Sequence, residues 1–143
     1  MRFRYASQDD VPALAAMNLT LIRDEGHRNT MSVAELCDRL SEWLAGEHRA
    51  VLFEDNTGPM GYALYRLDPD WTYLQQFLVL PEYRRQGVGR AALDWLFANA
   101  WVERPRIRLD VLIGNRSGVA FWRSVGFADY CLTMERKADP KPA

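Results

Sequence analysis

The fold of this chain is decided by the stretch Phe77-Leu78-Val79-Leu80-Pro81-Glu82-Tyr83-Arg84-Arg85-Gln86-Gly87-Val88-Gly89-Arg90. Its apolar beginning predicts the end of a strand, its glycines predict a loop, and the residues from Arg90 onward predict a helix. Glycines at such a junction let backbone N–H groups approach an anion, and the helix dipole favours negative charge there. The stretch therefore predicts a phosphate-binding loop flanked by arginines.

The spacing Arg84-x-x-Gly87-x-Gly89 resembles the Q/R-x-x-G-x-G/A signature of the GNAT superfamily of N-acetyltransferases. A second block, residues 115–127, resembles the N-x-x-A-x-x-F-Y-x-x-x-G-F pattern of the same family. In the order of its elements the resemblance extends over about residues 2–136. It implies an acetyl-CoA-dependent enzyme that moves an acetyl group to a primary amine by direct attack.

The resemblance also implies which residues hold acetyl-CoA. The loop cradles the pyrophosphate, and the strand before it pairs with the pantetheine amides, so that the N–H of Val79 is a candidate for polarising the thioester carbonyl. Asn115 either bonds the pantetheine arm or caps the following helix. The expected cofactor contacts are Leu78, Val79, Leu80, Arg84, Arg85, Gln86, Gly87, Val88, Gly89, Arg90, Asn115, Phe121 and Trp122.

Trp122 departs from the family pattern. Many members have tyrosine there, which protonates the departing thiolate, whereas an indole N–H is no acid near neutral pH. Trp122 is therefore interpreted as a wall of the cofactor site or as a hydrogen-bond donor. Tyr73 falls about where some members have a catalytic glutamate, and Tyr130 is the alternative acid, so that Tyr73, Tyr130 and Trp122 are the catalytic candidates.

The acceptor site in this family is built from the first two helices and their connection. Asp24, Glu25 and His27 lie there and could attract a cationic amine or supply a base. Gln75 is a further candidate for contact with the acceptor. The acceptor class stays open among small polyamines, amino acids, antibiotics and peptide or protein amines.

Periodicity and capping signals predict the elements. A strand period of two places Tyr73, Gln75, Phe77 and Val79 on one face. The expected fold is α/β (α+β): a mixed, mostly antiparallel sheet with helices on both faces, and the resemblance adds a splayed central strand pair. A single domain over residues 1–137 precedes a flexible tail, 138–143. The expected strands are residues 2–6, 49–55, 60–67, 71–80, 107–112 and 130–136, and the expected helices are residues 7–22, 32–44, 90–101 and 116–125.

Composition narrows the function classes. The 143 residues carry 18 Lys and Arg against 19 Asp and Glu, a net charge of −1, so no global field attracts nucleic acid or an anionic membrane. Cys37 and Cys131 have no metal-ligand spacing, and we expect no metal. The N-terminus lacks the apolar run of a signal peptide, which predicts a cytoplasmic protein. The resemblance implies a possible homodimer.

Two alternatives stay open on the sequence. Trp122 and the missing strand carboxylate would also suit a CoA-binding or regulatory module of the same fold that lacks catalysis. An enzyme that uses a longer acyl-CoA donor is the other alternative.

Overall fold

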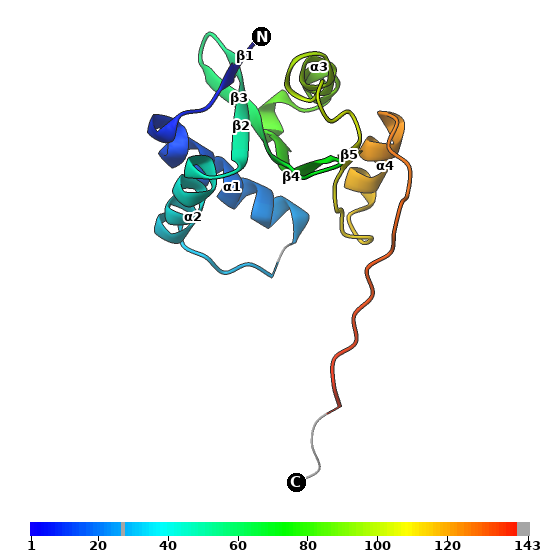
Figure 1. Cartoon of the computed structure of the whole chain (residues 1–143). Helices are drawn as coiled ribbons and strands as arrows, with labels where there is room; N and C mark the ends of the chain where they lie inside the picture. Colours follow the sequence, from blue (N-terminus) through cyan, green and yellow to red (C-terminus); the bar gives the residue numbers. More distant parts are fainter. Residues whose placement is uncertain (27, 140–143) are drawn as a thin grey trace.

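The structure is a computed structural model that describes residues 1–26 and 28–139 (Figure 1). The strands are β1 (Arg2–Tyr5), β2 (His48–Asp55), β3 (Gly58–Leu67), β4 (Thr72–Val79) and β5 (Ile107–Arg108). The α-helices are α1 (Val11–Glu25), α2 (Val33–Ala45), α3 (Val88–Trp95) and α4 (Arg116–Ser124). Single 3₁₀ turns at Gln8–Asp10 and Pro81–Tyr83 precede α1 and α3, and a π-helical turn, Leu96–Ala100, extends α3.

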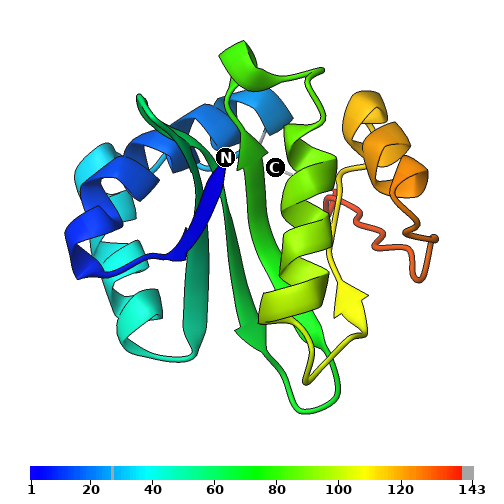
Figure 2. The ribbon, with the colours of Figure 1, turned by 90° about the horizontal axis from the view of Figure 1, so that it is seen from above.

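The strands form one sheet in the order β1-β2-β3-β4-β5, in which only the pair β4–β5 is parallel. Helices α1 and α2 cover one face, and α3 and α4 lie against the other (Figures 1 and 2). The expected mixed, mostly antiparallel sheet with helices on both faces is confirmed.

A separate core fills each side of the sheet. The first core lies under α1 and α2 and includes the fully buried Leu14, Leu36, Leu40, Tyr62 and Leu64. The second core lies under α3 and includes Phe53, Tyr65, Leu93, Leu96 and Trp101. Both faces of β2 and β3 are therefore buried, which explains their nearly continuous apolar sequence.

The start of α2 follows its capping signal. The Ser32 side chain accepts a hydrogen bond from the Glu35 N–H (3.2 Å), and Glu35 Oε1 accepts one from the Ser32 N–H (3.1 Å). This reciprocal pair satisfies two N–H groups that the first turn leaves without helical partners. The predicted helix start at Ser32 is confirmed.

The splay expected between the central strands is visible in the pairing of β4 with β5. These strands pair only through Thr72 with Ile107 and Tyr73 with Arg108. The chain after Arg108 then separates from β4, so β5 is much shorter than the strand expected over residues 107–112. The edge of β4 from about residue 74 onward therefore faces a gap instead of a strand.

A β-bulge at Gln75 changes which side chains of β4 share a face. The expectation that residues 73, 75, 77 and 79 all lie on one face is therefore wrong. In the register with β3, Leu64 pairs with Gln76 and Tyr65 pairs with Leu74, so Gln75 is the extra residue. An inserted residue shifts the alternation of side chains by one position. Residues 73 and 75 consequently share the α1–α2 face, whereas residues 77 and 79 pack with the second core on the opposite face.

The strand expected over residues 130–136 is absent. Residues 128–139 form neither helix nor strand and run away from the body of the domain (Figure 1). Their apolar side chains alternate as in a strand, but no strand among the described residues pairs with their backbone. Residues 140–143 of the predicted tail lie outside the described residues.

The contact of Gly61 with β4 generates a stability prediction. A Cβ at position 61 would lie 2.0 Å from the Leu78 carbonyl oxygen, which belongs to the backbone and cannot rotate away. We expect Gly61→Ala to lower the free energy of unfolding by about 2–3 kcal/mol, measured by urea denaturation.

Gly114→Ala is the matched control, because a Cβ there meets no atom within 4 Å. Equal stability of the Gly61 and Gly114 variants would contradict the close approach of β3 to β4.

Candidate functional site

The loop between β4 and α3 has the backbone of an anion site. Arg85 and Gly87 both have positive φ angles, 61° and 77°, and α3 begins directly afterwards at Val88. The Ala91 N–H donates to the Gly87 carbonyl (3.0 Å), so the preceding N–H groups at the start of α3 have no partner within the helix. These N–H groups and the helix dipole make the loop suited to bind an anion.

The two glycines of the loop serve different purposes. Gly87 needs its positive φ, and a Cβ there would meet no atom within 4 Å, so the space beside it is open. A Cβ on Gly89 would lie 3.0 Å from the Phe121 ring, so this glycine allows α3 to pack closely on α4. Gly87 is therefore the glycine whose surroundings suit close approach of a ligand.

The arginines of the loop are not equivalent. Arg84 is held in place, since its Nε donates to the Val79 carbonyl (2.8 Å) and its guanidinium pairs with Asp24 at the end of α1. Arg90 donates to the Ser124 carbonyl (3.3 Å). The Arg85 side chain is exposed and has no partner in the described part of the chain. Arg85 thus has the most freely available charge.

The gap-facing edge of β4 is defined by its hydrogen bonds. Leu80 N–H donates to the Met60 carbonyl of β3 (2.8 Å). Backbone groups alternate in direction along an antiparallel strand, so Leu78 also faces β3, whereas Phe77 and Val79 turn their backbone groups toward the gap. The sequence analysis named Val79 but missed Phe77. An alternating strand pattern does not show on which side of the strand a neighbouring strand is missing.

Asn115 caps α4 in this structure. Its Oδ1 accepts hydrogen bonds from the Gly118 N–H (3.1 Å) and the Ser117 hydroxyl (3.4 Å). A Cβ at position 118 would lie 2.4 Å from Asn115 Nδ2, which explains glycine where the family pattern has alanine. Of the two roles expected for Asn115, capping of the following helix is therefore the one that its Oδ1 atom fulfils in this structure.

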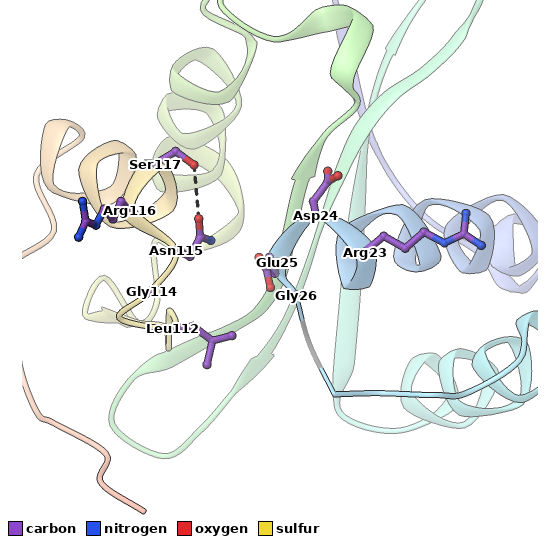
Figure 3. A pocket seen from close by; sticks show the side chains of 9 residues that line it. All are labelled: Arg23, Asp24, Glu25, Gly26, Leu112, Gly114, Asn115, Arg116 and Ser117. Carbon is purple, nitrogen blue, oxygen red and sulfur yellow. Dashed lines mark hydrogen bonds between the residues drawn. The ribbon is translucent and has the colours of Figure 1, made fainter.

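A cavity of about 530 Å³ lies between the end of α1 and the start of α4. It brings together the predicted acceptor residues Asp24 and Glu25 with the predicted cofactor residue Asn115. Figure 3 shows the side chains of Arg23 and Arg116 pointing away from this space. His27, the third member of the predicted cluster, lies outside the described residues. The full lining is Arg23, Asp24, Glu25, Gly26, Leu112, Gly114, Asn115, Arg116 and Ser117.

Trp122 belongs to an aromatic cluster. Its ring lies 5.2 Å from Phe77 of β4, 5.0 Å from Phe121 and 5.2 Å from Phe127, each in an edge-to-face arrangement. Such contacts fix α4 against the second-core face of the sheet. This packing agrees with the interpretation of Trp122 as a wall.

The two tyrosines that are candidate catalytic residues lie apart from Trp122. Tyr73 is on the α1–α2 face, where its hydroxyl donates to Asp110 Oδ2 (2.6 Å). Burial and then the Asp110 carboxylate raise the pKa of Tyr73, which keeps its hydroxyl protonated. Tyr130 is exposed, and its hydroxyl accepts a hydrogen bond from Arg108 (3.1 Å). The bulge at Gln75 thus places Tyr73 on the opposite face from Phe77 and Val79, with which the strand period of two had grouped it.

Polar residues that sequence reasoning missed surround Tyr73 and Gln75. Arg66 stacks 4.5 Å over the Tyr73 ring and donates to Gln75 Oε1 (3.1 Å). His48 stacks on Trp43, and burial followed by the charge of Arg66 lowers the pKa of His48. These residues come from separate strands, so only the register of β2, β3 and β4 could have grouped them.

The sequence matches the profile of the acetyltransferase (GNAT) family over residues 17–127. The chain belongs to the GNAT acetyltransferase family. The match includes both the loop before α3 and the block that forms α4. No curated protein matches the sequence closely enough to count as a relative.

Solved structures share the fold of this GNAT chain. The BH1408 protein from Bacillus halodurans, as a tetramutant, superimposes with a TM-score of 0.78 at 20% identity, covering 96% of this chain and 100% of that chain. A predicted acetyltransferase from Clostridium acetobutylicum, with acetyl-CoA, gives 0.74 at 21% identity and covers 95% of both chains. The aminoglycoside 6'-N-acetyltransferase AAC(6')-IG from Acinetobacter haemolyticus gives 0.74 at 18% identity, covering 97% and 100%.

Two features are absent from the described residues. No helix there is long and apolar enough to cross a membrane. Nor does that part of the chain contain a group of three or more His, Cys, Asp or Glu side chains placed to hold a metal ion.

The lowered pKa of His48 generates a pH prediction. Because the unfolded chain binds this proton more readily, the stability linked to neutral His48 is present above about pH 6.5 and is lost as the pH falls toward the folded pKa. We expect the wild type to lose more stability than His48→Gln between about pH 7.5 and pH 6, measured by urea denaturation.

The glutamine variant is its own control, since it keeps a polar side chain that cannot titrate in this range. A parallel loss of stability in both proteins would show that His48 is not the titrating group.

Proposed function

We propose that this GNAT chain is an N-acetyltransferase that transfers the acetyl group of acetyl-CoA to a primary amine by direct attack. The observation that carries the proposal is the loop from Arg85 to Val88, where positive φ angles and a helix start leave N–H groups beside open space. A diphosphate carries the charge that such a loop binds best.

The rest of acetyl-CoA fits along the gap-facing edge of β4. Its pantetheine arm carries amides, and the Val79 N–H and the backbone groups of Phe77 face the gap, where they can pair with these amides as an added strand would. Val79 lies nearer the loop and its carbonyl already accepts from Arg84, so Phe77 is the better placed to polarise a thioester carbonyl at the far end of the arm. Phe121 and Trp122 would wall this gap.

The acceptor is proposed to be a small-molecule or peptide amine that enters near the end of α1. The carboxylates of Glu25 and of Asp24, which also pairs with Arg84, line the cavity there, and negative charge of this kind attracts a cationic amine. The likeness to AAC(6')-IG, an aminoglycoside 6'-N-acetyltransferase, makes aminoglycosides one class to include among the amines tested.

The chemical step needs a neutral amine, because an ammonium has no lone pair. The amine nitrogen bonds to the carbonyl carbon, the C–S bond breaks, CoA leaves as a thiolate, and one proton leaves the nitrogen. We assign that proton to the Tyr73–Asp110 pair: the Tyr73 oxygen accepts it while passing its own proton to the carboxylate. Holding both reactants in the gap supplies much of the acceleration by proximity.

The charge requirement of the loop predicts the effect of substitutions at Gly87. Asp and Asn have nearly the same shape and both tolerate positive φ, but only Asp brings a negative charge against the diphosphate. We expect Gly87→Asp to weaken acetyl-CoA binding at least about 10-fold more than Gly87→Asn, measured by calorimetry. Equal affinities in two folded variants would place the diphosphate elsewhere.

The proton path predicts different effects for the catalytic candidates. Tyr73→Phe and Asp110→Asn should each lower kcat by about 100-fold and leave the affinity for acetyl-CoA unchanged. Trp122→Phe and Tyr130→Phe should keep most of the turnover, since Trp122 packs against aromatic rings and Tyr130 is exposed. The assay is release of free CoA with a panel of polyamines, amino acids, aminoglycosides and peptides.

Equal rates in the four variants would remove the tyrosine relay. Tight acetyl-CoA binding by the wild type without turnover on any amine would favour the non-catalytic CoA-binding module instead.

A further inference from the structure

Arg39 of α2 is a half-buried cation that has no carboxylate partner in the described part of the chain. Its Nη2 donates to Asn18 Oδ1 of the neighbouring helix α1 (3.1 Å), and an asparagine amide carries no charge (Figure 1). The Nε of Arg39 is buried and has no hydrogen-bond partner among the described residues. Burial lowers the pKa of Arg39. A buried charge is costly unless an opposite charge compensates it, so this position suits a ligand with a negative charge.

Arg66 on the same side of the sheet differs from Arg39. Its Nε donates to Asp68 Oδ1 (2.9 Å), so the chain itself supplies a negative charge for Arg66. Arg39 therefore adds one uncompensated positive charge to this side. A single guanidinium matches a carboxylate, which carries one charge and accepts two parallel N–H bonds. A phosphate, with a charge of about −2, needs more positive charge than Arg39 offers.

Trp43 holds the Arg39 guanidinium in place. The central carbon of the guanidinium lies 4.5 Å from the centre of the Trp43 ring, and the ring also stacks on His48 with 4.8 Å between centres. Contact of this kind between a cation and an aromatic ring restricts the planar guanidinium. Arg39 and Trp43 are both partly exposed, so a ligand can reach them from solvent. The site is therefore arranged before a ligand binds.

Tyr62 of β3 connects Arg39 with the proposed reaction centre. Burial raises the pKa of Tyr62; the charge of Glu25 raises it further, and the charge of Arg39 opposes the rise. Glu25 and Arg39 therefore both lie near this buried hydroxyl, which donates to Gln76 Oε1 (2.8 Å). Gln76 precedes Phe77, the residue proposed to polarise the thioester carbonyl. Arg39 thus lies on the side of β4 from which the proposed acceptor approaches.

We propose that the acceptor is an amine that also carries a carboxylate, as an amino acid does, and that the Arg39 guanidinium binds this carboxylate. The inference rests on the proposed acetyl transfer and names one class of acceptor for it. Glu25 attracts the amine end of such a molecule and Arg39 attracts the other end, so two opposite charges orient it. Polyamines and aminoglycosides carry only positive charge, and Arg39 repels them.

Matched acceptors test the role of the carboxylate. In the CoA-release assay each amino acid is paired with its amide, which keeps the amine but has no negative charge. We expect the wild type to have a kcat/KM at least about 30-fold higher for the preferred amino acid than for its amide. The amine of an amide is less basic and more often neutral, so the state of the amine alone would favour the amide.

Variants of Arg39 test which residue reads the carboxylate. Arg39→Gln should raise KM for the amino acid by at least about 30-fold and change KM for the amide little, and Arg39→Lys should restore part of the preference. Because Arg39 has no carboxylate partner, Arg39→Gln removes no ion pair and is expected to fold. Arg49→Gln is the matched control, since Arg49 pairs with Tyr65 in the register and so lies on the opposite face of the sheet.

Three kinetic results would overturn the proposal and leave acetyl transfer standing. The first is turnover of amides, polyamines or aminoglycosides at a kcat/KM equal to or above that of the amino acids. The second is an unchanged preference for the amino acid in Arg39→Gln. The third is a preference for O-phosphoethanolamine over the amino acids, which would assign the site to phosphate.

Binding of reaction products tests the site without turnover. In the presence of CoA, N-acetylglycine and N-acetylphenylalanine should raise the Tm of the wild type more than their amides do, and Arg39→Gln should lose this difference. The same difference in Arg39→Gln, or none in the wild type, would overturn the proposal. A difference that requires Arg39, in a protein that acetylates no amine, would support the carboxylate site and reject the proposed reaction.

Discussion

The structure depends on the early separation of β5 from β4. Only two residue pairs, Thr72 with Ile107 and Tyr73 with Arg108, join these strands. Beyond them the backbone groups of Phe77 and Val79 have no strand neighbour, although buried backbone groups require partners. The gap beside β4 follows from this separation, and in the proposed function it receives the pantetheine arm of acetyl-CoA, which has amides of its own.

The bulge at Gln75 gives the two sides of the sheet different chemistry. Before the bulge, Tyr73 faces α1 and α2 and meets Arg66 and Asp110. After it, Phe77 faces the second core and meets Trp122. An aromatic wall and a polar cluster therefore lie on opposite faces of one strand. In the proposed reaction CoA leaves as a thiolate and the Tyr73–Asp110 pair takes the proton of the amine, so no tyrosine is required at position 122.

Rigidity at the loop comes from contacts that no motif describes. Arg84 joins the end of α1 to the last gap-facing carbonyl of β4, through Asp24 and Val79. This arginine thereby fixes the position of the loop, while Arg85 keeps its charge available to a ligand. The first residue of the sequence signature thus holds the scaffold, whereas its neighbour Arg85 is exposed and has no partner in the described part of the chain.

The sequence by itself determined the features that depend on neighbours along the chain. The loop around Gly87, the capping box at Ser32 and the helix of residues 116–124 follow from glycine conformations, side-chain caps and local periodicity. Only the tertiary structure decided on which face of the sheet Tyr73 lies, that its hydroxyl donates to Asp110, and that residues 130–136 form no strand. Those features depend on the register between strands, on a bulge and on which strand edge is free. Strand pairing joins residues that are far apart in the sequence, and the local alternation of side chains is the same whichever strands pair.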